Sequence, residues 1–124
     1  MRQFGVLESA IMNVLWSRSA DGAAMTVREV LEVLRRDRPL AYTTVMTVLD
    51  NLHRKGFLRR KRDGRAWRYT PVASRDAYAA EAMTEMLSDS LDPRAVFLHL
   101  VSQLSPEEAA QLRAVLGQAP GDSA

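Results

Sequence analysis

The hydrophobic periodicity of the chain changes abruptly at Gly56, and this change constrains the possible folds more than any other feature. Gly56 is a typical residue just past the end of a helix. Residues 57–69, which follow it, are predicted to form two short strands joined at Asp63-Gly64, a dipeptide that favours β-hairpins. The preceding residues 42–55 have the apolar spacing of a helix, with one face made of Val45, Val48, Leu49 and Leu52. The sequence therefore predicts a helix that leads directly into a hairpin.

Two further helices are predicted before this unit. Residues 6–17 repeat apolar side chains with the i, i+3, i+4 spacing of an amphipathic helix, and the small, polar residues 17–24 predict a loop. Thr26 and Glu29 match a capping box, so a second helix is expected to begin there and to end before Pro39.

The predicted hairpin is strongly basic and is therefore expected to project from the domain. A two-residue loop of Asp63 and Gly64 gives the cross-strand pairs Arg62 with Arg65, Arg60 with Trp67, and Leu58 with Tyr69. All six of these residues share one face, from which only the apolar and aromatic members are expected to pack inward. Arg59, Lys61 and Arg68 lie on the other face.

Charge divides the chain into two unlike halves. The net charge of +2 is the sum of +7 in residues 1–70 and −5 in residues 71–124, and residues 54–68 alone hold eight basic residues and one acidic residue. Such asymmetry points to a polyanionic partner for the first half. Three helices followed by a basic hairpin is also the order of a winged helix-turn-helix, in which the third helix enters the major groove of DNA.

The side chains expected to contact DNA come from the third helix and the hairpin. Short hydroxyl and amide groups suit base edges and phosphates, whereas arginines suit flanking phosphates. The candidates are Thr43, Thr44, Thr47, Asn51, Arg54, Arg60, Lys61, Arg62 and Arg65. The predicted fold class is therefore mainly α with a small β-hairpin, in which residues 1–72 form a winged helix-turn-helix and residues 73–124 form a helical dimerisation domain.

The second domain is predicted to contain three helices: 74–90, one opened by Asp92-Pro93, and one opened by a capping box at Ser105. About fifty residues rarely bury three apolar stripes unaided, so we expect a homodimer, with packing against the same chain's first half as the alternative. Candidate dimerisation residues are Met83, Met86, Leu87, Val96, Phe97, Leu100, Val101, Leu104, Leu112 and Leu116. The tail from about Gly117 is expected to be flexible.

Several segments together resemble the BlaI/MecI penicillinase-repressor family, over nearly the whole chain. They are Leu7 to Trp16, Tyr42 to Leu52, Lys55-Gly56, and Asp63-Gly64-Arg65 through Tyr69. The resemblance implies a homodimeric winged-helix repressor of palindromic operators with TACA/TGTA-type half-sites, controlling β-lactamase or cell-wall-stress genes. It also implies that Thr43, Thr44, Thr47 and Asn51 lie in the groove, while the hairpin around Arg60 to Arg65 touches the DNA backbone.

The resemblance further implies a route of induction. Family members are released from DNA when a membrane sensor-protease leads to cleavage in the C-terminal half. The corresponding bond here is His99-Leu100, where the family pattern has Asn-Phe. From the sequence, His99 itself is expected to be a partly buried helix residue.

Other classes of function find little support in the residues. The absence of cysteine removes disulfides and thiolate metal sites, no Gly-rich phosphate loop or nucleophile elbow is present, and no cofactor or metal is expected. We therefore do not expect an enzyme. No apolar run has the length of a membrane span and no signal peptide is recognised, which predicts a cytoplasmic protein. The alternative function is a basic winged-helix module that binds nucleic acid non-specifically, or binds RNA or protein.

Overall fold

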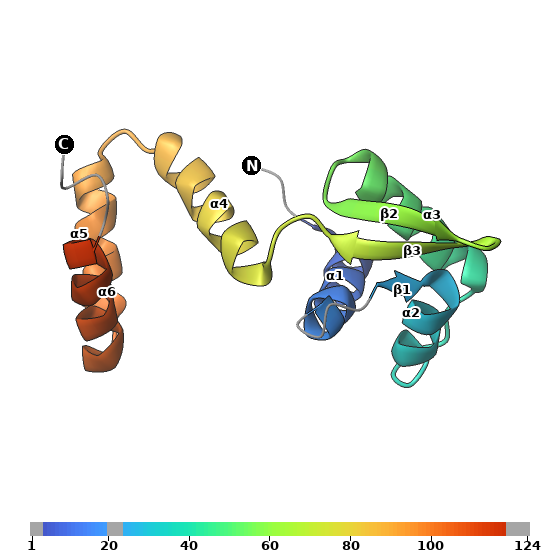
Figure 1. Ribbon diagram of the computed structural model, residues 1–124. Helices are drawn as coiled ribbons and strands as arrows, with labels where there is room; N and C mark the ends of the chain where they lie inside the picture. The colour runs from blue at the N-terminus through green and yellow to red at the C-terminus, as the bar shows by residue number, and fades with distance from the viewer. Residues whose placement is uncertain (1–3, 20–23, 119–124) are drawn as a thin grey trace. The chain divides into compact units, whose positions relative to one another are not determined.

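The structure is a computed structural model that describes residues 4–19 and 24–118. The chain divides into two compact units, Met1–Ala82 and Met83–Ala124. In chain order, the elements are α1 (Val6–Ser19), β1 (Met25–Thr26), α2 (Val27–Leu34), α3 (Tyr42–Arg54), β2 (Leu58–Asp63), β3 (Ala66–Pro71), α4 (Arg75–Ser88), α5 (Pro93–Gln103) and α6 (Pro106–Gln118) (Figure 1). The predicted helices and hairpin are confirmed.

Two boundaries differ from those expected from the sequence. Gly117 belongs to α6, so the tail predicted to be flexible from that residue is wrong for 117 and 118, and its remainder lies outside the described residues. In the predicted loop 17–24, residues 17–19 continue α1, while 20–23 lie outside the described residues. In the described ranges, none of the helices combines the length and apolar character needed to cross a membrane.

Local side-chain hydrogen bonds start the helices where the sequence predicts. The Glu29 amide donates to Thr26 Oγ1 (3.2 Å) and the Thr26 amide donates to Glu29 Oε1 (2.9 Å), which completes the capping box of α2. A second reciprocal pair joins Ser105 and Glu108 at the start of α6. These bonds satisfy amides that the first helical turn leaves without an intrahelical acceptor.

The hairpin turn lies one residue later than predicted. Asp63 pairs with Ala66, Arg62 with Trp67 and Arg60 with Tyr69, so the loop consists of Gly64 and Arg65. Gly64 has φ = 64° and Arg65 has no positive φ, the pattern of a type II′ turn with glycine at its first central position. Because each pairing moves by two residues, side chains stay on their predicted faces, but Arg65 leaves the ladder for the turn.

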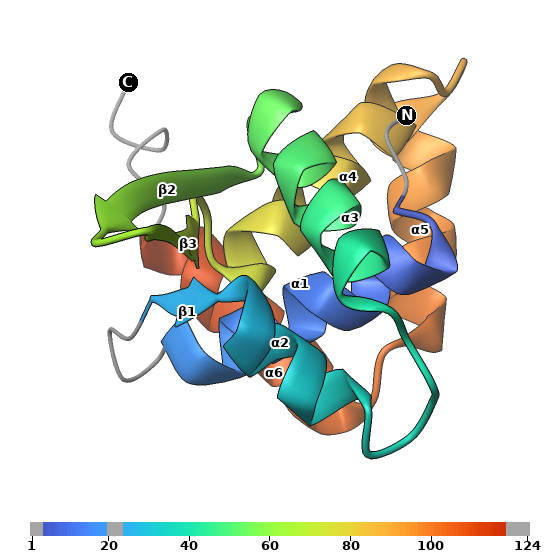
Figure 2. The same ribbon diagram turned by 90° about the vertical axis from the view of Figure 1, so that its right-hand side faces the viewer.

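A third strand was not predicted from the sequence. The two-residue β1 pairs antiparallel with β3, Met25 opposite Tyr69, so the sheet order is β1-β3-β2 (Figure 2). This short strand lies immediately before α2, and its pairing ties the start of that helix to the hairpin. At one edge of the sheet β1 leads into α2, and at the other edge β2 contacts α3, so the hairpin is fixed to both helices.

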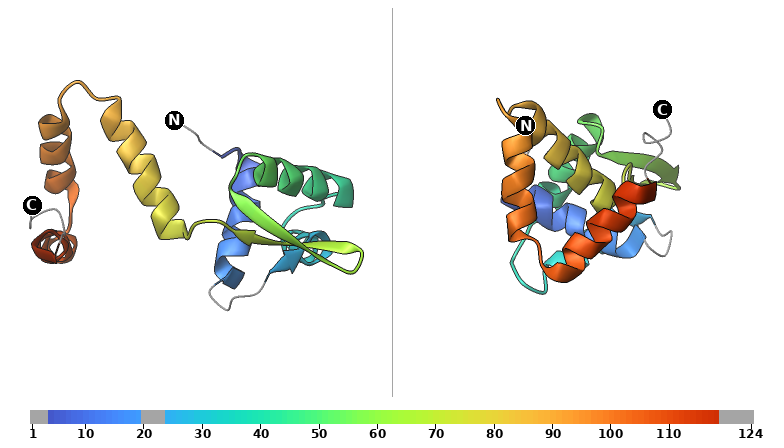
Figure 3. Two further views of the ribbon diagram at one scale, coloured as in Figure 1. Left: turned by 45° about the horizontal axis from the view of Figure 1, so that its top comes forward. Right: turned by 90° about the vertical axis from the view of Figure 1, so that its left-hand side faces the viewer.

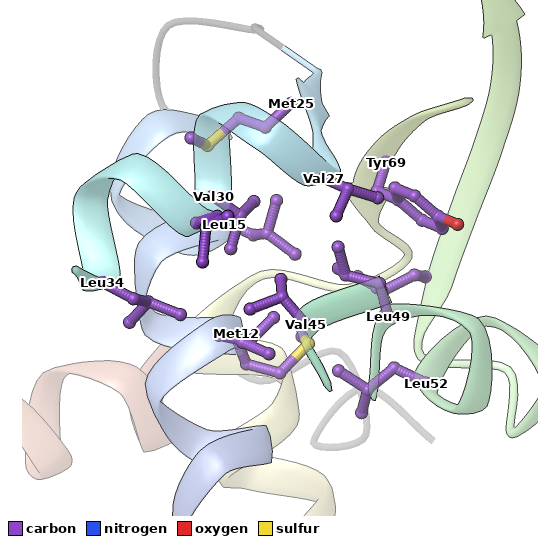
Figure 4. Close-up of a cluster of buried hydrophobic side chains, with 13 residues drawn as sticks. Met12, Leu15, Met25, Val27, Val30, Leu34, Val45, Leu49, Leu52 and Tyr69 are labelled. Atoms are coloured by element: carbon purple, nitrogen blue, oxygen red, sulfur yellow. The ribbon is translucent and has the colours of Figure 1, made fainter. Parts of the chain in front are cut away.

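The core lies between α1, α2, α3 and the inner face of the sheet (Figure 4). Tyr69 and Leu58 reach it from the hairpin, and both are almost fully buried, as predicted. Trp67 packs at the edge of this core. The fully enclosed helical members are Ile11, Met12, Leu15, Val30, Val45, Leu49 and Leu52. Because α3 buries three of these side chains, its opposite face is held in a fixed orientation outside the core.

The three C-terminal helices have a different character. Figure 3 shows α4, α5 and α6 as successive helices after the hairpin. No side chain of these three helices is buried, although α5 is largely apolar. Phe97 is 49% exposed and Val101 is 51% exposed. His99, which the sequence led us to expect partly buried, is exposed. The expectation was wrong because α5 has no buried side chain, so the helix offers no buried face for His99.

Candidate nucleic-acid interface

The exposed face of α3 presents the short polar side chains predicted to contact DNA. Thr43, Thr44 and Thr47 are exposed, and Asn51 is half-buried further along the helix. Residues 43, 47, 51 and 54 follow the i, i+4 and i, i+3 spacing of a single helical face, opposite the buried Val45, Leu49 and Leu52. The core thus orients this row of hydroxyl, amide and guanidinium groups towards solvent.

The N-terminus of α3 is open. Ala41 is the N-cap residue and provides no side-chain oxygen to the first turn. The first amides of a helix carry partial positive charge and suit an anion such as a phosphate. Together with the neighbouring Thr43 and Thr44, this end of the helix therefore offers hydrogen-bond donors to a DNA backbone.

Basic side chains of the hairpin lie in two groups. Lys61, Arg62 and Arg65 are exposed, and the Arg62 guanidinium carbon lies 5.0 Å from the centre of the Trp67 ring. Arg60 is more enclosed, since its Cζ lies 4.3 Å from the same ring centre. All four were predicted as DNA contacts; Lys61, Arg62 and Arg65 are exposed, whereas Arg60 is half-buried.

An ion-pair network joins the hairpin to α3. Asp50 Oδ1 accepts from Arg60 Nη1 at 3.2 Å, and Asp50 Oδ2 lies 3.3 Å from Arg54 Nε. Arg54 also donates to the Asn51 side chain. The structure therefore brings three of the predicted contact residues, Arg54, Arg60 and Asn51, into one cluster around a carboxylate whose bridging role the sequence did not reveal.

Arg68 lies on the other face of the hairpin, where it links the hairpin to the rest of the first unit. It donates to Asp63 (2.7 Å), to Glu29 (3.2 Å) and to the carbonyl of Ala24 (3.2 Å), so it ties the hairpin to the start of α2. The carboxylate of Asp63 is the main reason why the pKa of Arg68 is raised. The pKa of Glu29 is lowered, mainly because its carboxylate accepts from the Thr26 amide.

A similar contact fixes the end of α3 to α1. Lys55 Nζ lies 3.0 Å from Glu8 Oε2, and the same carboxyl group accepts from the Gly5 amide. The Gly5 hydrogen bond and then Lys55 hold the pKa of Glu8 below its ordinary value. Among the described residues, no cluster of histidine, cysteine and carboxylate side chains has the composition of a metal site.

Comparison with known proteins gives a consistent set of relatives. The family model described as Penicillinase repressor matches residues 4–118. The transcriptional regulator BlaI of Mycobacterium tuberculosis (strain CDC 1551 / Oshkosh) is 42% identical over 121 residues, which cover 95% of this chain and 86% of the relative. The same identity and coverage are found for BlaI of strain ATCC 25618 / H37Rv.

Two similar solved structures cover about three fifths of this chain, and a third covers nearly all of it. The DNA-binding domain of the repressor BlaI matches with 29% identity and a TM-score of 0.52, covering 61% of this chain and 88% of that one. The monomeric form of Bacillus licheniformis BlaI, in complex with the blaP half-operator, matches with 28% identity and a TM-score of 0.50, covering 62% and 89%. MepR of Staphylococcus aureus, a transcription regulator of a multidrug efflux pump, shares the fold at 24% identity, with a TM-score of 0.51 and coverage of 94% and 77%.

Proposed function

Because the chain belongs to the penicillinase repressor family, we propose that it is a homodimeric transcriptional repressor that binds palindromic operator DNA. The observation that carries this proposal is the polar, outward face of α3 beside a basic hairpin, in a unit similar to BlaI bound to a half-operator. The proposed half-sites are of the TACA/TGTA type, and the protein acts in the cytoplasm.

DNA binding divides between base contacts and backbone contacts. Thr43, Thr44, Thr47 and Asn51 occupy the major groove, where threonine methyl groups suit thymine and amides suit adenine. The phosphates are contacted by the basic residues Arg54, Arg60, Lys61, Arg62 and Arg65. Phosphate contacts release counterions and make binding depend on salt, whereas base contacts supply the preference for one sequence.

Dimerisation is proposed for residues 73–124. The support is the exposed apolar surface of α5, since monomeric proteins rarely expose contiguous apolar patches of this kind without a partner. A two-fold dimer would place two α3 helices in grooves about one DNA turn apart, or a multiple of that spacing. Residues 71–124 carry the acidic excess, which disfavours a place beside DNA.

Sedimentation tests the dimer. Phe97→Asp is expected to convert the chain to a monomer, because a charge would be buried in the apolar interface. Thr43→Asp serves as a matched control, since it adds the same single negative charge at an exposed position of α3. A Phe97→Asp variant that sediments with the mass of the wild type, when the wild type is a dimer, would remove α5 from the interface.

Relief of repression is proposed to follow proteolysis in this domain, through a membrane sensor-protease and at the His99-Leu100 bond. Both residues are exposed, but they lie within α5, so this segment must open locally before cleavage. Mass spectrometry of the chain from induced cells would show a fragment beginning at Leu100. A chain that stays intact while repression is lifted would exclude this route.

A gel-shift titration tests the function itself. The probes are a TACA/TGTA palindrome and a scrambled duplex of equal length, each at two salt concentrations. A specific repressor is expected to favour the palindrome by a factor of about 10³ or more, and to lose this preference when one half-site is destroyed. Equal binding to both probes, collapsing with salt, would favour the alternative of a non-specific basic module.

A further inference from the structure

Asp50 places a carboxylate on the very helix face that is proposed to enter DNA. Its two oxygens are shared between Arg54 on α3, at 3.3 Å, and Arg60 on β2, at 3.2 Å. The side chain is 43% exposed, so it remains in the interface rather than beneath it. A negative charge in this place repels phosphates, so the presence of Asp50 in the proposed DNA interface needs a physical explanation.

The surroundings of Arg60 limit what its guanidinium does in the free protein. One side of the group contacts Asp50, and the Trp67 ring lies 4.3 Å from its Cζ. The Arg60 side chain is 25% exposed, whereas the Arg54 side chain is 68% exposed. Arg60 is therefore held by a carboxylate and an aromatic face, and Arg54 by the same carboxylate and by Asn51.

A carboxylate and a phosphate compete for the same guanidinium. Both are anions that accept charge-assisted hydrogen bonds, and the carboxylate cancels part of the guanidinium charge, so an arginine paired with Asp50 attracts a phosphate less strongly than a free one. On random DNA, phosphates approach in many registers and none is held in place. On an operator, the base contacts of α3 fix the phosphates beside the helix and favour exchange of the carboxylate for a phosphate.

We propose that Asp50 is a specificity-determining positioning residue, an internal competitor that withholds Arg54 and Arg60 from phosphates until α3 is seated on its operator. This inference rests on the proposed function, because it assumes that α3 enters the groove. Arg54 and Arg60 then contact phosphates in the operator complex, whereas Lys61, Arg62 and Arg65 contact phosphates on any DNA. The effect of Asp50 is thus to widen the difference between operator and random DNA.

The salt dependence of binding measures the number of phosphates contacted. Each phosphate changes the slope of log K against log salt by about −0.9 on duplex DNA. In Asp50→Asn, the slope on a random duplex is expected to steepen by about 1 to 2, as one or both arginines are released. The slope on the palindrome is expected to stay near that of the wild type, so discrimination falls by about tenfold at low salt. Asp50→Ala gives a second variant with a better helix-forming residue and the same expected slopes.

Two controls separate this effect from a general change in charge. Glu32→Gln removes one negative charge from an exposed position of α2 in the same unit, and is expected to leave the slope on random DNA unchanged. On random DNA, the double variant Asp50→Asn with Arg60→Gln is expected to have a less steep slope than Asp50→Asn alone, because it lacks one of the released guanidinium groups. Circular dichroism confirms that each variant is folded.

The outcomes are distinct. A slope on random DNA that is the same in Asp50→Asn and Asp50→Ala as in the wild type, or a slope that steepens equally in Glu32→Gln, would overturn the proposal. Loss of preference at one G·C pair without a change of slope would also overturn it, because Asp50 would then accept from a cytosine amino group. If the wild type shows no preference for the palindrome, the proposed operator fails, but the slopes on random DNA still decide whether Asp50 withholds the arginines.

Discussion

Phe4 is predicted to stabilise the first unit through ring contacts that join segments far apart in the sequence. Its ring stacks on Tyr78 of α4 with a centroid distance of 4.7 Å and an interplanar angle of 7°. It also meets Phe57 edge-on at 4.8 Å and Trp16 of α1 at 6.3 Å. The ring of Phe4 therefore lies at the junction of α1, the segment after α3, and the start of α4.

The magnitude follows from these three contacts. Aromatic pairs contribute about 0.5–1.5 kcal/mol each beyond the area they bury, so the lower limit for three is about 1.5 kcal/mol. Lost burial of a half-buried side chain adds roughly 1 kcal/mol. Phe4→Ala is therefore expected to lower the free energy of unfolding by about 2–3 kcal/mol, whereas Phe4→Leu keeps most of the apolar area and is expected to cost about 1–2 kcal/mol.

Thermal unfolding followed by circular dichroism provides the assay. For a unit of this size, a loss of 2 kcal/mol corresponds to a fall in Tm of roughly 10 °C. Wild type, Phe4→Ala and Phe4→Leu are compared at one protein concentration, because the Tm of an oligomer depends on concentration. A Tm of Phe4→Ala within about 1 °C of the wild type would refute the reasoning, and so would equal losses for the two variants, since the leucine would then add nothing by its area.

Three further predictions concern the hairpin, the start of α2 and the core. Replacing both Arg62 and Arg65 by alanine is expected to reduce the salt slope on any duplex by up to about 1.8, measured by anisotropy; an unchanged slope would contradict their role. The lowered pKa of Glu29 means that its carboxylate stabilises the fold above its ordinary pKa and that this stabilisation is lost as pH falls through the lower, folded value. Glu29→Gln is therefore expected to be less stable at neutral pH and to show a flatter loss in acid, whereas parallel pH profiles would contradict this. Leu49→Ala, at a fully buried position of α3, is expected to cost about 2–5 kcal/mol in urea unfolding, and a cost below about 1 kcal/mol would contradict the core assignment.

The sequence predicts best those features that depend only on residues close together in the chain. The capping box at Thr26 and the end of α3 before Gly56 both depend on neighbouring residues, and both are confirmed. The two-residue β1 was missed because so short a segment has no periodicity, and its pairing with Tyr69 is set by tertiary contact. The hairpin register was wrong because Asp63-Gly64 and Gly64-Arg65 place glycine in different turn types, a choice made by the whole sheet.

The candidate interface was predictable as a surface, but its internal pairings were not. Helical spacing alone put Thr43, Thr47 and Asn51 on the outer face of α3. The contact of Asp50 with Arg60 joins two elements, and its existence depends on how closely β2 approaches α3. From the sequence alone, Arg60 and Arg62 are equivalent basic residues of the hairpin. In the structure, Arg60 is half-buried against Trp67, whereas Arg62 is exposed.

The outer face of α3 and the hairpin are proposed to form the DNA interface. The most direct test is a titration of the 15N-labelled full chain with a TACA/TGTA palindrome, following backbone amide signals by NMR. The largest shifts are expected to cluster in residues 41–54 and at the β2–β3 turn, around Lys61 to Arg65. Shifts confined to α5 and α6, with α3 unaffected, would contradict it.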